Sequence, residues 1–311
     1  MPNFLCVALT QKRLNVGIVN DKGEIVKYHY QYFEDLPSDL DVITDIVRLS
    51  KNVSKGYNPV MCTVAIPEIV DAIEGIWNSF RNGFGIPIRS TLQKKLGIPV
   101  FVDNDCKVSA VGEKEFGSMQ YEENFCYISA ADGLGGALYI NNKLFRGIHN
   151  GAGEFGHISI DDEGELCDCG ARGCVETFAT SKAITKYYEI LSSKKISSFN
   201  EVVALARHGD TDAIESFNRA GYALGKMIAY ILNITNITRF VIGGVVGMEY
   251  DLLEKSIYEA VNKYALKTPN YDFKITKTEI GYDAALIGCA AYSLIVSRNP
   301  GIYAQLQKKG V

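Results

Sequence analysis

Three cysteines and a histidine are grouped in one polar, glycine-rich stretch of the chain. The group consists of His157, Cys167, Cys169 and Cys174, in the pattern H-x9-C-x-C-x4-C. Three thiolates and one imidazole form a complete tetrahedral ligand set, the arrangement of a structural zinc site. Gly170 and Gly173 allow the chain to turn around an ion within so few residues. The alternative is that the three cysteines share a loop without any relation to His157; the spacing favours zinc.

The other five cysteines have a different environment. Cys6, Cys62, Cys126 and Cys289 lie in apolar runs, and Cys106 follows an acidic turn. We expect all five to be buried free thiols. In a reducing compartment the cluster at 167–174 then indicates metal binding rather than disulfides, so we expect a cytoplasmic protein.

Short strands and helices alternate in the part of the chain that precedes this cluster. Runs rich in β-branched and aromatic residues predict strands at 3–9, 14–19, 24–30, 60–66 and 99–102. Apolar residues at helical spacing predict helices at 41–49 and 107–116. Together they predict a first α/β lobe over residues 1–118.

A second lobe is predicted over residues 119–283, with the zinc loop at 157–174. Strands are expected at 125–129, 138–140 and 239–242. A long helix is predicted by an apolar stripe that comprises Ile214, Phe217, Gly221, Leu224, Ile228 and Ile231. Another helix should follow Glu249, and an apolar closing helix at 284–311 should pack back on the first lobe. The alternation predicts an α/β protein of two lobes with a cleft between them.

Composition excludes several classes of function. With 32 Lys+Arg against 36 Asp+Glu the formal charge is −4, which argues against a broad nucleic-acid surface. A hydrophobic fraction of 47% excludes disorder as the main state. The apolar runs at 4–9 and 284–296 are shorter than the ~20 residues that span a bilayer, so no membrane association is expected.

The motifs around the cysteine cluster resemble the signature of the ROK family, which comprises repressors, open reading frames and sugar kinases. They are AGEFGH at 152–157, CDCG at 167–170 and GCVE at 173–176. VDND at 102–105 and the Gly-Gly pair at 243–244 are also similar to the family pattern, so the resemblance covers nearly the whole chain. It implies a two-lobed actin/hexokinase-like (ribonuclease H-like) α/β fold with a sugar cleft between the lobes.

The resemblance also implies a set of residues that hold sugar hydroxyls. Carried over position by position, these are Asn104, Asp105, Glu154, His157 and Glu176. The chemistry agrees, because a hydroxyl both donates and accepts, and fixed carboxylates and amides can pair with several hydroxyls at once. His157 would bind zinc through one ring nitrogen and leave the other for the sugar.

Two of these residues have simpler alternatives. Asp105 follows a strand and precedes a helix, where Asp is a common N-cap. Glu176 precedes a helical run and could be a solvent-exposed acid of its first turn.

The resemblance does not extend to the two motifs that bind the phosphates of ATP in the kinases of this family. Kinases of this family open with D-x-G-G-T, where the acid supports magnesium and the glycines admit phosphate; residues 8–13 here are ALTQKR. The second phosphate hairpin should be G-T-G-x-G, but residues 131–136 are ADGLGG, with Asp132 in place of the hydroxyl. The glycines that remain, Gly133, Gly135, Gly243 and Gly244, mark a degenerate nucleotide site.

Two functions remain from this comparison. The favoured one is a sugar-sensing effector domain of a transcriptional regulator, with structural Zn²⁺, a small-molecule sugar ligand and a homodimeric state. The chain begins at its first strand without the helix-turn-helix of the family's repressors, so no direct contact with nucleic acid is expected. The alternative is an ATP-dependent sugar kinase of glucokinase, fructokinase or N-acetylhexosamine kinase type that uses Mg-ATP, with Asp105 as general base.

Overall fold

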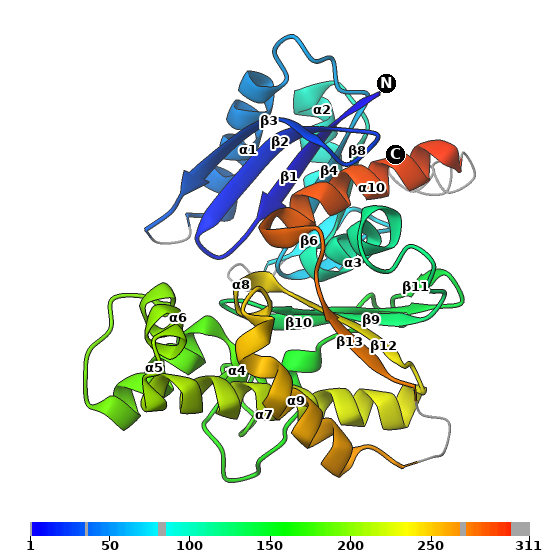
Figure 1. Ribbon diagram of the computed structural model, residues 1–311. Helices are drawn as coiled ribbons and strands as arrows, with labels where there is room; N and C mark the ends of the chain where they lie inside the picture. The colour runs from blue at the N-terminus through cyan, green and yellow to red at the C-terminus, as the bar shows by residue number, and fades with distance from the viewer. Residues whose placement is uncertain (1, 35–36, 80–84, 268–271, 300–311) are drawn as a thin grey trace. The chain divides into compact units, whose positions relative to one another are not determined.

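The computed structural model describes residues 2–34, 37–79, 85–267 and 272–299. The chain forms two compact units (Figure 1). Unit 1 comprises Met1–Tyr121, Leu144–Ala152 and Asp283–Val311, and unit 2 comprises Glu122–Lys143 and Gly153–Tyr282.

Unit 1 is built on a mixed five-stranded sheet in the order β3-β2-β1-β4-β8. Its strands are β1 (Asn3–Leu9), β2 (Arg13–Asn20), β3 (Ile25–Tyr32), β4 (Met61–Ile66) and β8 (Val100–Asn104). The β1–β2–β3 part is antiparallel, and β4 and β8 run parallel to β1. The strands at 3–9, 14–19, 24–30, 60–66 and 99–102 that we predicted are all present, within two residues at each end.

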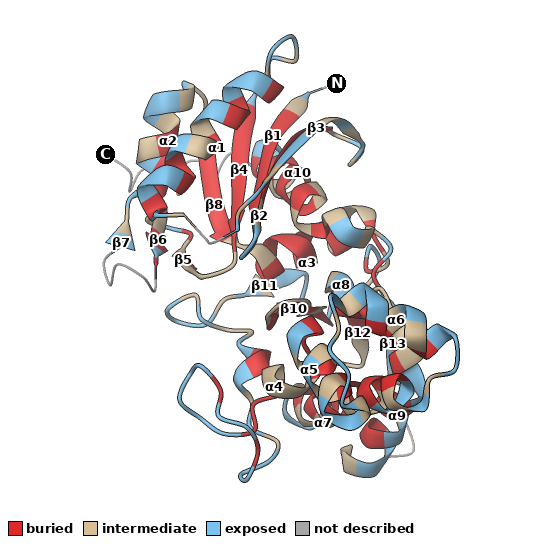
Figure 2. Ribbon diagram, turned by 90° about the vertical axis from the view of Figure 1, so that its left-hand side faces the viewer, coloured by how far each residue is buried: buried red, intermediate tan, exposed pale blue. Residues whose placement is uncertain are grey.

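Helices cover both faces of this sheet, which explains why its central strands are apolar on both sides. On one face, α1 (Asp39–Val53) and α2 (Ile88–Leu96) pack against Leu5, Val7 and Leu9. On the other face, α3 (Asp105–Phe116) and α10 (Ala284–Arg298) pack against Phe4, Cys6 and Ala8. Figure 2 shows the resulting continuous burial of β1, β4 and β8. The predicted closing helix is therefore α10, observed to Arg298; residues 300–311 lie outside the described part of the chain.

A small antiparallel sheet in unit 1 was not predicted from the sequence. It consists of β5 (Ile69–Asp71), β6 (Ile76–Asn78) and β7 (Gly85–Ile86), in that order. Strands of two or three residues carry too little alternation to be recognised.

A second five-stranded sheet, in the order β11-β10-β9-β12-β13, belongs to unit 2 except for the last two residues of its edge strand β11. Its strands are β9 (Phe125–Ala130), β10 (Leu134–Ile140), β11 (Lys143–Phe145), β12 (Arg239–Gly243) and β13 (Lys274–Lys277). The helices are α4 (Glu176–Ala179), α5 (Ser181–Ser192), α6 (Phe199–Arg207), α7 (Thr211–Thr235), α8 (Gly244–Gly247) and α9 (Tyr250–Tyr264), with 3₁₀ turns η1 (Phe155–His157) and η2 (Gly281–Asp283).

The long helix α7 confirms the predicted apolar stripe except at its first position. Phe217, Gly221, Leu224 and the two following stripe residues are buried, whereas Ile214 is 38% exposed. The buried part of the stripe packs in the core of unit 2 with residues of β9, β12 and α9.

The unit boundaries differ from the predicted lobes by up to three residues at 118–121 and at 283, and by one internal segment. Residues 144–152, which we assigned to the second lobe, belong to unit 1. The reason is an ion pair between Arg146 and Asp103 of β8, together with a hydrogen bond from Asn150 to the Val70 carbonyl.

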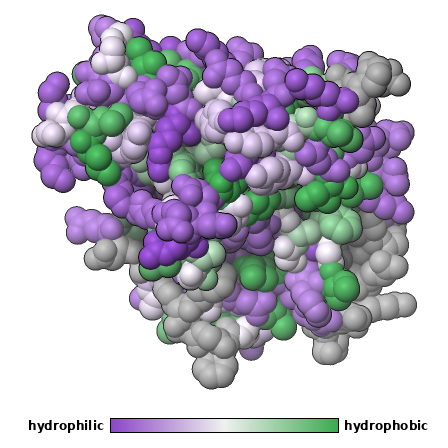
Figure 3. Space-filling model, turned by 90° about the horizontal axis from the view of Figure 1, so that it is seen from below, coloured by the Kyte–Doolittle hydropathy of each residue, from purple (hydrophilic) through white to green (hydrophobic). Residues whose placement is uncertain are grey.

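No helix within the described ranges is long and apolar enough to cross a bilayer. Seen from below, hydrophobic residues form small groups among hydrophilic ones (Figure 3).

Candidate functional site

The four predicted metal ligands converge in unit 2. One ligand atom each from His157, Cys167, Cys169 and Cys174 lies within 4.8 Å of the others. Cys167 Sγ is 3.6 Å from His157 Nδ1, and Cys169 Sγ is 3.6 Å from Cys174 Sγ. Zn–S bonds of about 2.3 Å in a tetrahedron place two sulfurs about 3.8 Å apart, so the donor set and its spacing fit zinc.

Backbone hydrogen bonds within the loop fix the positions from which these side chains converge. Cys167 N–H donates to Ala171 O at 2.8 Å, and Gly170 N–H donates to Cys167 O at 2.8 Å. Burial raises the pKa of the Cys174 thiol to about 12, whereas a hydrogen bond from the backbone of Ala171 lowers the pKa of the exposed Cys169 thiol. A divalent cation would favour the thiolate form of both. The five remaining cysteines are buried and free, as predicted.

Glu154 and His157 lie at the two ends of one 3₁₀ turn. Glu154 precedes η1 and His157 closes it; residues three apart in a 3₁₀ helix lie on the same side. The Glu154 side chain is exposed, and its carboxylate makes no hydrogen bond or ion pair with any residue that the structure describes. Since Nδ1 of His157 faces the thiols, Nε2 is the nitrogen left for another ligand.

Steric contact with β10 explains why the residue in the middle of this turn is a glycine. A Cβ at Gly156 would lie 2.1 Å from the Leu134 carbonyl oxygen at the start of β10. Only glycine therefore allows the turn that carries Glu154 and His157 to approach the strand this closely.

Glu176 begins α4 and is attached to the same strand. Its Oε2 accepts a hydrogen bond from Leu134 N–H at 2.9 Å, while Oε1 has no donor among the described residues. The half-buried carboxylate is thus not the solvent-exposed acid that the alternative interpretation expected. Leu134 connects the two motifs, since its carbonyl faces Gly156 and its N–H binds Glu176.

The remaining candidate sugar ligands, Asn104 and Asp105, belong to unit 1 at the junction of β8 and α3. Asn104 is the N-cap, and its Oδ1 accepts hydrogen bonds from the N–H groups of Cys106 (3.1 Å) and Lys107 (3.2 Å). The capping role that we considered for Asp105 therefore belongs mainly to its neighbour. Asp105 is half-buried in the first turn, with Oδ1 accepting from Cys106 N–H at 2.8 Å.

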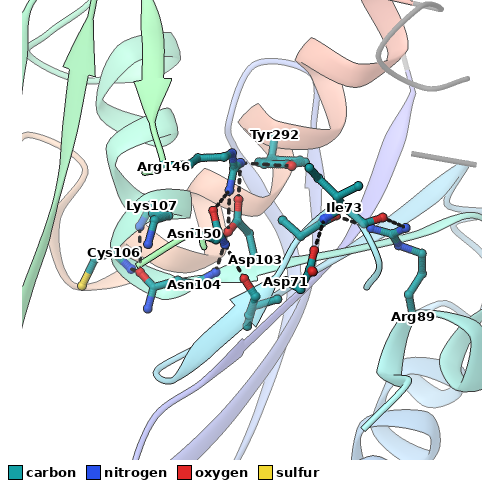
Figure 4. A network of polar contacts seen from close by, with 12 residues as sticks. Asp71, Ile73, Arg89, Asp103, Asn104, Cys106, Lys107, Arg146, Asn150 and Tyr292 are labelled. Carbon is teal, nitrogen blue, oxygen red and sulfur yellow. Dashed lines mark hydrogen bonds and ion pairs between the residues drawn. The ribbon is translucent and has the colours of Figure 1, made fainter. Parts of the chain in front are cut away.

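A buried ion pair beside these residues was not predicted from the sequence. Asp103, fully buried, receives two hydrogen bonds from Arg146, at 3.0 and 2.5 Å. Figure 4 shows Arg146 also directed at Asn150 and Tyr292. Burial, and secondly the Asp103 charge, raise the pKa of Tyr292 to about 12. The network fixes the end of β8, from which Asn104 and Asp105 follow directly.

The β1–β2 turn, where kinases of the resembling family carry their first phosphate loop, is closed on itself. The Thr10 hydroxyl oxygen accepts hydrogen bonds from the N–H groups of Arg13 (2.9 Å) and Lys12 (3.4 Å). Backbone donors that would have to face a phosphate are therefore engaged by a side chain of the same turn.

The β9–β10 turn has a side-chain contact of a different kind. Asp132 Oδ1 accepts a hydrogen bond from Ser181 Oγ at 2.6 Å, at the first residue of α5. Because a helix N-terminus attracts negative charge, this carboxylate occupies a position that favours an anion. Gly133 lies in the turn and Gly135 within β10, which begins earlier than predicted.

The Gly-Gly pair after β12 has a packing explanation. Gly244 has φ +78°, and a Cβ there would lie 2.3 Å from the Ala130 carbonyl oxygen. A Cβ at Gly243 would lie 2.6 Å from the Tyr127 hydroxyl. Both glycines are required by the close approach to β9, whether or not a nucleotide binds.

Comparison with known proteins places these features in a family. The profile of the ROK family matches residues 4–295. The xylose repressor of Bacillus subtilis is 27% identical over 281 residues, which cover 88% of this chain and 73% of the repressor. The glucokinase of Thermotoga maritima is 25% identical over 293 residues, which cover 89% of this chain and 92% of the kinase.

A solved structure agrees with the predicted fold. A ROK family glucokinase from Streptomyces griseus, in complex with glucose and AMPPNP, matches with a TM-score of 0.83 at 24% identity, over 93% of this chain and 98% of that one. The fold is therefore the actin/hexokinase-like α/β fold that we predicted.

Proposed function

The chain belongs to the ROK family, and on this premise we propose that it is a carbohydrate-binding protein that serves as the sugar-sensing effector domain of a transcriptional regulator. One observation carries the proposal against a kinase. Of the two turns that would receive the nucleotide phosphates, one has its backbone amides engaged by Thr10, and the other carries the Asp132 carboxylate, which Ser181 holds at the start of α5.

The proposed sugar ligands are Asn104 and Asp105 of unit 1 and Glu154, His157 and Glu176 of unit 2. Glu154 supports this, because its exposed carboxylate has no protein partner among the described residues and both of its oxygens are available to accept from sugar hydroxyls. In Glu176 the Oε1 atom is similarly available. We expect the sugar to be a pentose or hexose, since xylose and glucose are the sugars in the names of its relatives.

We propose that zinc is the metal of the His157–Cys174 cluster and that its role is structural. The four ligands fill a tetrahedral set without an open position for a reacting water. Zinc would hold Nδ1 of His157 and thereby orient the ring.

The second candidate function is an ATP-dependent sugar kinase. It is favoured by Asp105, a half-buried carboxylate at the start of α3, where a general base could accept the proton of an attacking hydroxyl. The alignment with a glucokinase over 92% of that enzyme also supports it.

The proposal is tested by a thermal-shift screen of D-xylose, D-glucose and N-acetylhexosamines, followed by calorimetry on the sugar that stabilises the protein. Glu154→Gln should weaken binding by roughly 1–3 kcal/mol, about 5- to 150-fold. The matched control is Glu163→Gln, an exposed acid of the zinc loop, which should leave the affinity unchanged. If both variants bind as the parent does, the site assignment is wrong.

A further inference from the structure

A pocket within unit 2 is lined by residues that the proposed function does not use. It has a volume of about 670 Å³ and is lined by the zinc loop, α4, α5, α7 and α9. Its central lining residues are Phe178, Tyr187, Asn218, Arg219, Tyr222 and Lys226. The volume is in the range of pockets that hold small molecules.

Arg219 has an unusual position in this pocket. Its guanidinium carbon lies 4.3 Å from the ring centre of Phe178 and 4.4 Å from that of Tyr187, so the group is held by two aromatic rings. Glu215, one helical turn earlier, would be its ordinary partner. That acid instead accepts a hydrogen bond from Asn218 at 3.3 Å.

The donors of Arg219 have no acceptor in the described part of the chain. Neither a hydrogen bond nor an ion pair reaches the guanidinium, although five N–H groups are available. Partial burial lowers the pKa of Arg219, against smaller opposing effects of Tyr187, Glu165 and Asp161. The guanidinium is planar, is held in place by the two rings and has N–H donors without acceptors among the described residues. Such a group is suited to bidentate binding of a carboxylate or phosphate.

We propose that this pocket binds a small oxyanion, with Arg219 as its principal ligand. Lys226, whose Nζ donates one hydrogen bond to Ile160 O at 2.6 Å, has two further donors, and exposed Lys255 lies on the same lining. The lining also contains three acids, Asp161, Glu215 and Glu259. This mixture of charges selects a small anion and opposes a polyanion such as nucleic acid.

The pocket adjoins the segments that carry candidate sugar ligands. Phe178 is two residues from Glu176 on α4. Ile160, which Lys226 contacts, is bonded through its N–H to Gly173 O beside Cys174. An anion bound in this pocket would therefore stabilise the zinc loop and α4.

The test is calorimetric titration of the intact, zinc-loaded protein with inorganic phosphate and, separately, with succinate at constant ionic strength. We expect saturable binding of one of them, which identifies the anion class. Arg219→Met should weaken it at least tenfold, and Arg219→Lys, which retains the charge without the planar fork, should weaken it less. Arg207→Met is the matched control: it removes an arginine of α6 that pairs with Glu249 and Asp251, and should change the affinity less than twofold.

Two outcomes would overturn the proposal. One is that neither anion saturates the parent protein. The other is that Arg219→Met and Arg207→Met weaken binding equally, which would indicate non-specific attraction. If Arg219→Met does not fold, Arg219→Lys against the parent decides the same question. Because neither probe is a sugar, these results are independent of the proposed carbohydrate function.

Discussion

At the scale of single residues, the charge that the fold must compensate most completely is that of Asp103. Its side chain is fully buried at the end of β8, and Arg146 pairs with it through both terminal nitrogens. An ionised carboxylate in such a position is tolerated only when it is paired and hydrogen-bonded. The pair therefore stabilises the strand end that presents Asn104 and Asp105.

Arg146→Met should lower the free energy of unfolding by about 3–5 kcal/mol, because it leaves a buried carboxylate without its partner. The measurement is urea denaturation followed by circular dichroism. Arg298→Met is the control within unit 1, since Arg298 pairs with Glu115 at the surface and should cost about 0–1 kcal/mol. Similar losses in the two variants would contradict the role given to Asp103.

Single residues also show where prediction from sequence ends. Asp103 and Arg146 are 43 positions apart, and no local pattern connects them. Asn104 and Asp105 are both good N-cap residues, and only the backbone geometry, with Asn104 extended at φ −64° and ψ 141°, shows which one caps α3. The Cys and His residues were predictable because their ligand chemistry requires proximity whatever the intervening fold.

At the scale of elements, the zinc loop and the turn at Glu154 depend on each other. Cys169→Ser should release the metal and lower sugar affinity, because the loop orients His157 and joins Glu176 through Cys174. Elemental analysis of unchelated protein should find one zinc per parent chain and well under one in the variant. Cys106→Ser, which changes a cysteine of α3 outside the cluster, should retain zinc; equal zinc content in all three proteins would refute the assignment.

The approach of η1 to β10 gives a second prediction at this scale. Gly156→Ala would place a methyl group 2.1 Å from Leu134 O, so the turn must move away from the strand. We expect the melting temperature to fall and sugar affinity to decrease at least tenfold. At Gly151 a Cβ meets nothing within 4 Å, and Gly151→Ala should change stability by less than about 0.5 kcal/mol. Unchanged sugar binding in Gly156→Ala would show that this contact does not position Glu154.

Helices and strands were predicted correctly from the sequence where buried apolar residues recur in a regular pattern. Strands β1, β2 and β4 are apolar on both faces because helices cover both, and they were found almost to the residue. β10 was placed too short, because Leu134-Gly135-Gly136 resembles a phosphate loop while it is in fact paired with β9. Gly136 of β10 faces the ring of Phe155 in η1, a contact that sequence periodicity does not reveal.

At the scale of the whole molecule, the modifications that oppose nucleotide binding are present in both units. The β1–β2 turn belongs to unit 1 and the β9–β10 turn to unit 2. Loss of a single phosphate contact could be compensated elsewhere, but here Thr10 engages the turn amides of unit 1 and Asp132 places a negative charge in the turn of unit 2. The candidate sugar residues are retained in both units. On the proposed function, the residues for the sugar are present in this chain, whereas the two phosphate turns depart from the kinase pattern.

Mg-ATP should therefore neither stabilise the protein nor be consumed when the bound sugar is present. A ligand at 100 times its dissociation constant adds about 2.7 kcal/mol to the native state, a shift of several degrees that a thermal-shift assay resolves for the sugar. For Mg-ATP we expect no shift, because Thr10 engages amides of the β1–β2 turn, Glu176 engages the first amide of β10, and Asp132 adds a negative charge beside α5. A coupled ADP-release assay with D-xylose, D-glucose and N-acetylhexosamines is the second measurement. Turnover near 1–100 per second, the usual range of kinases, that Asp105→Asn abolishes would establish the kinase and overturn the sensor, whereas binding of sugar without turnover supports it.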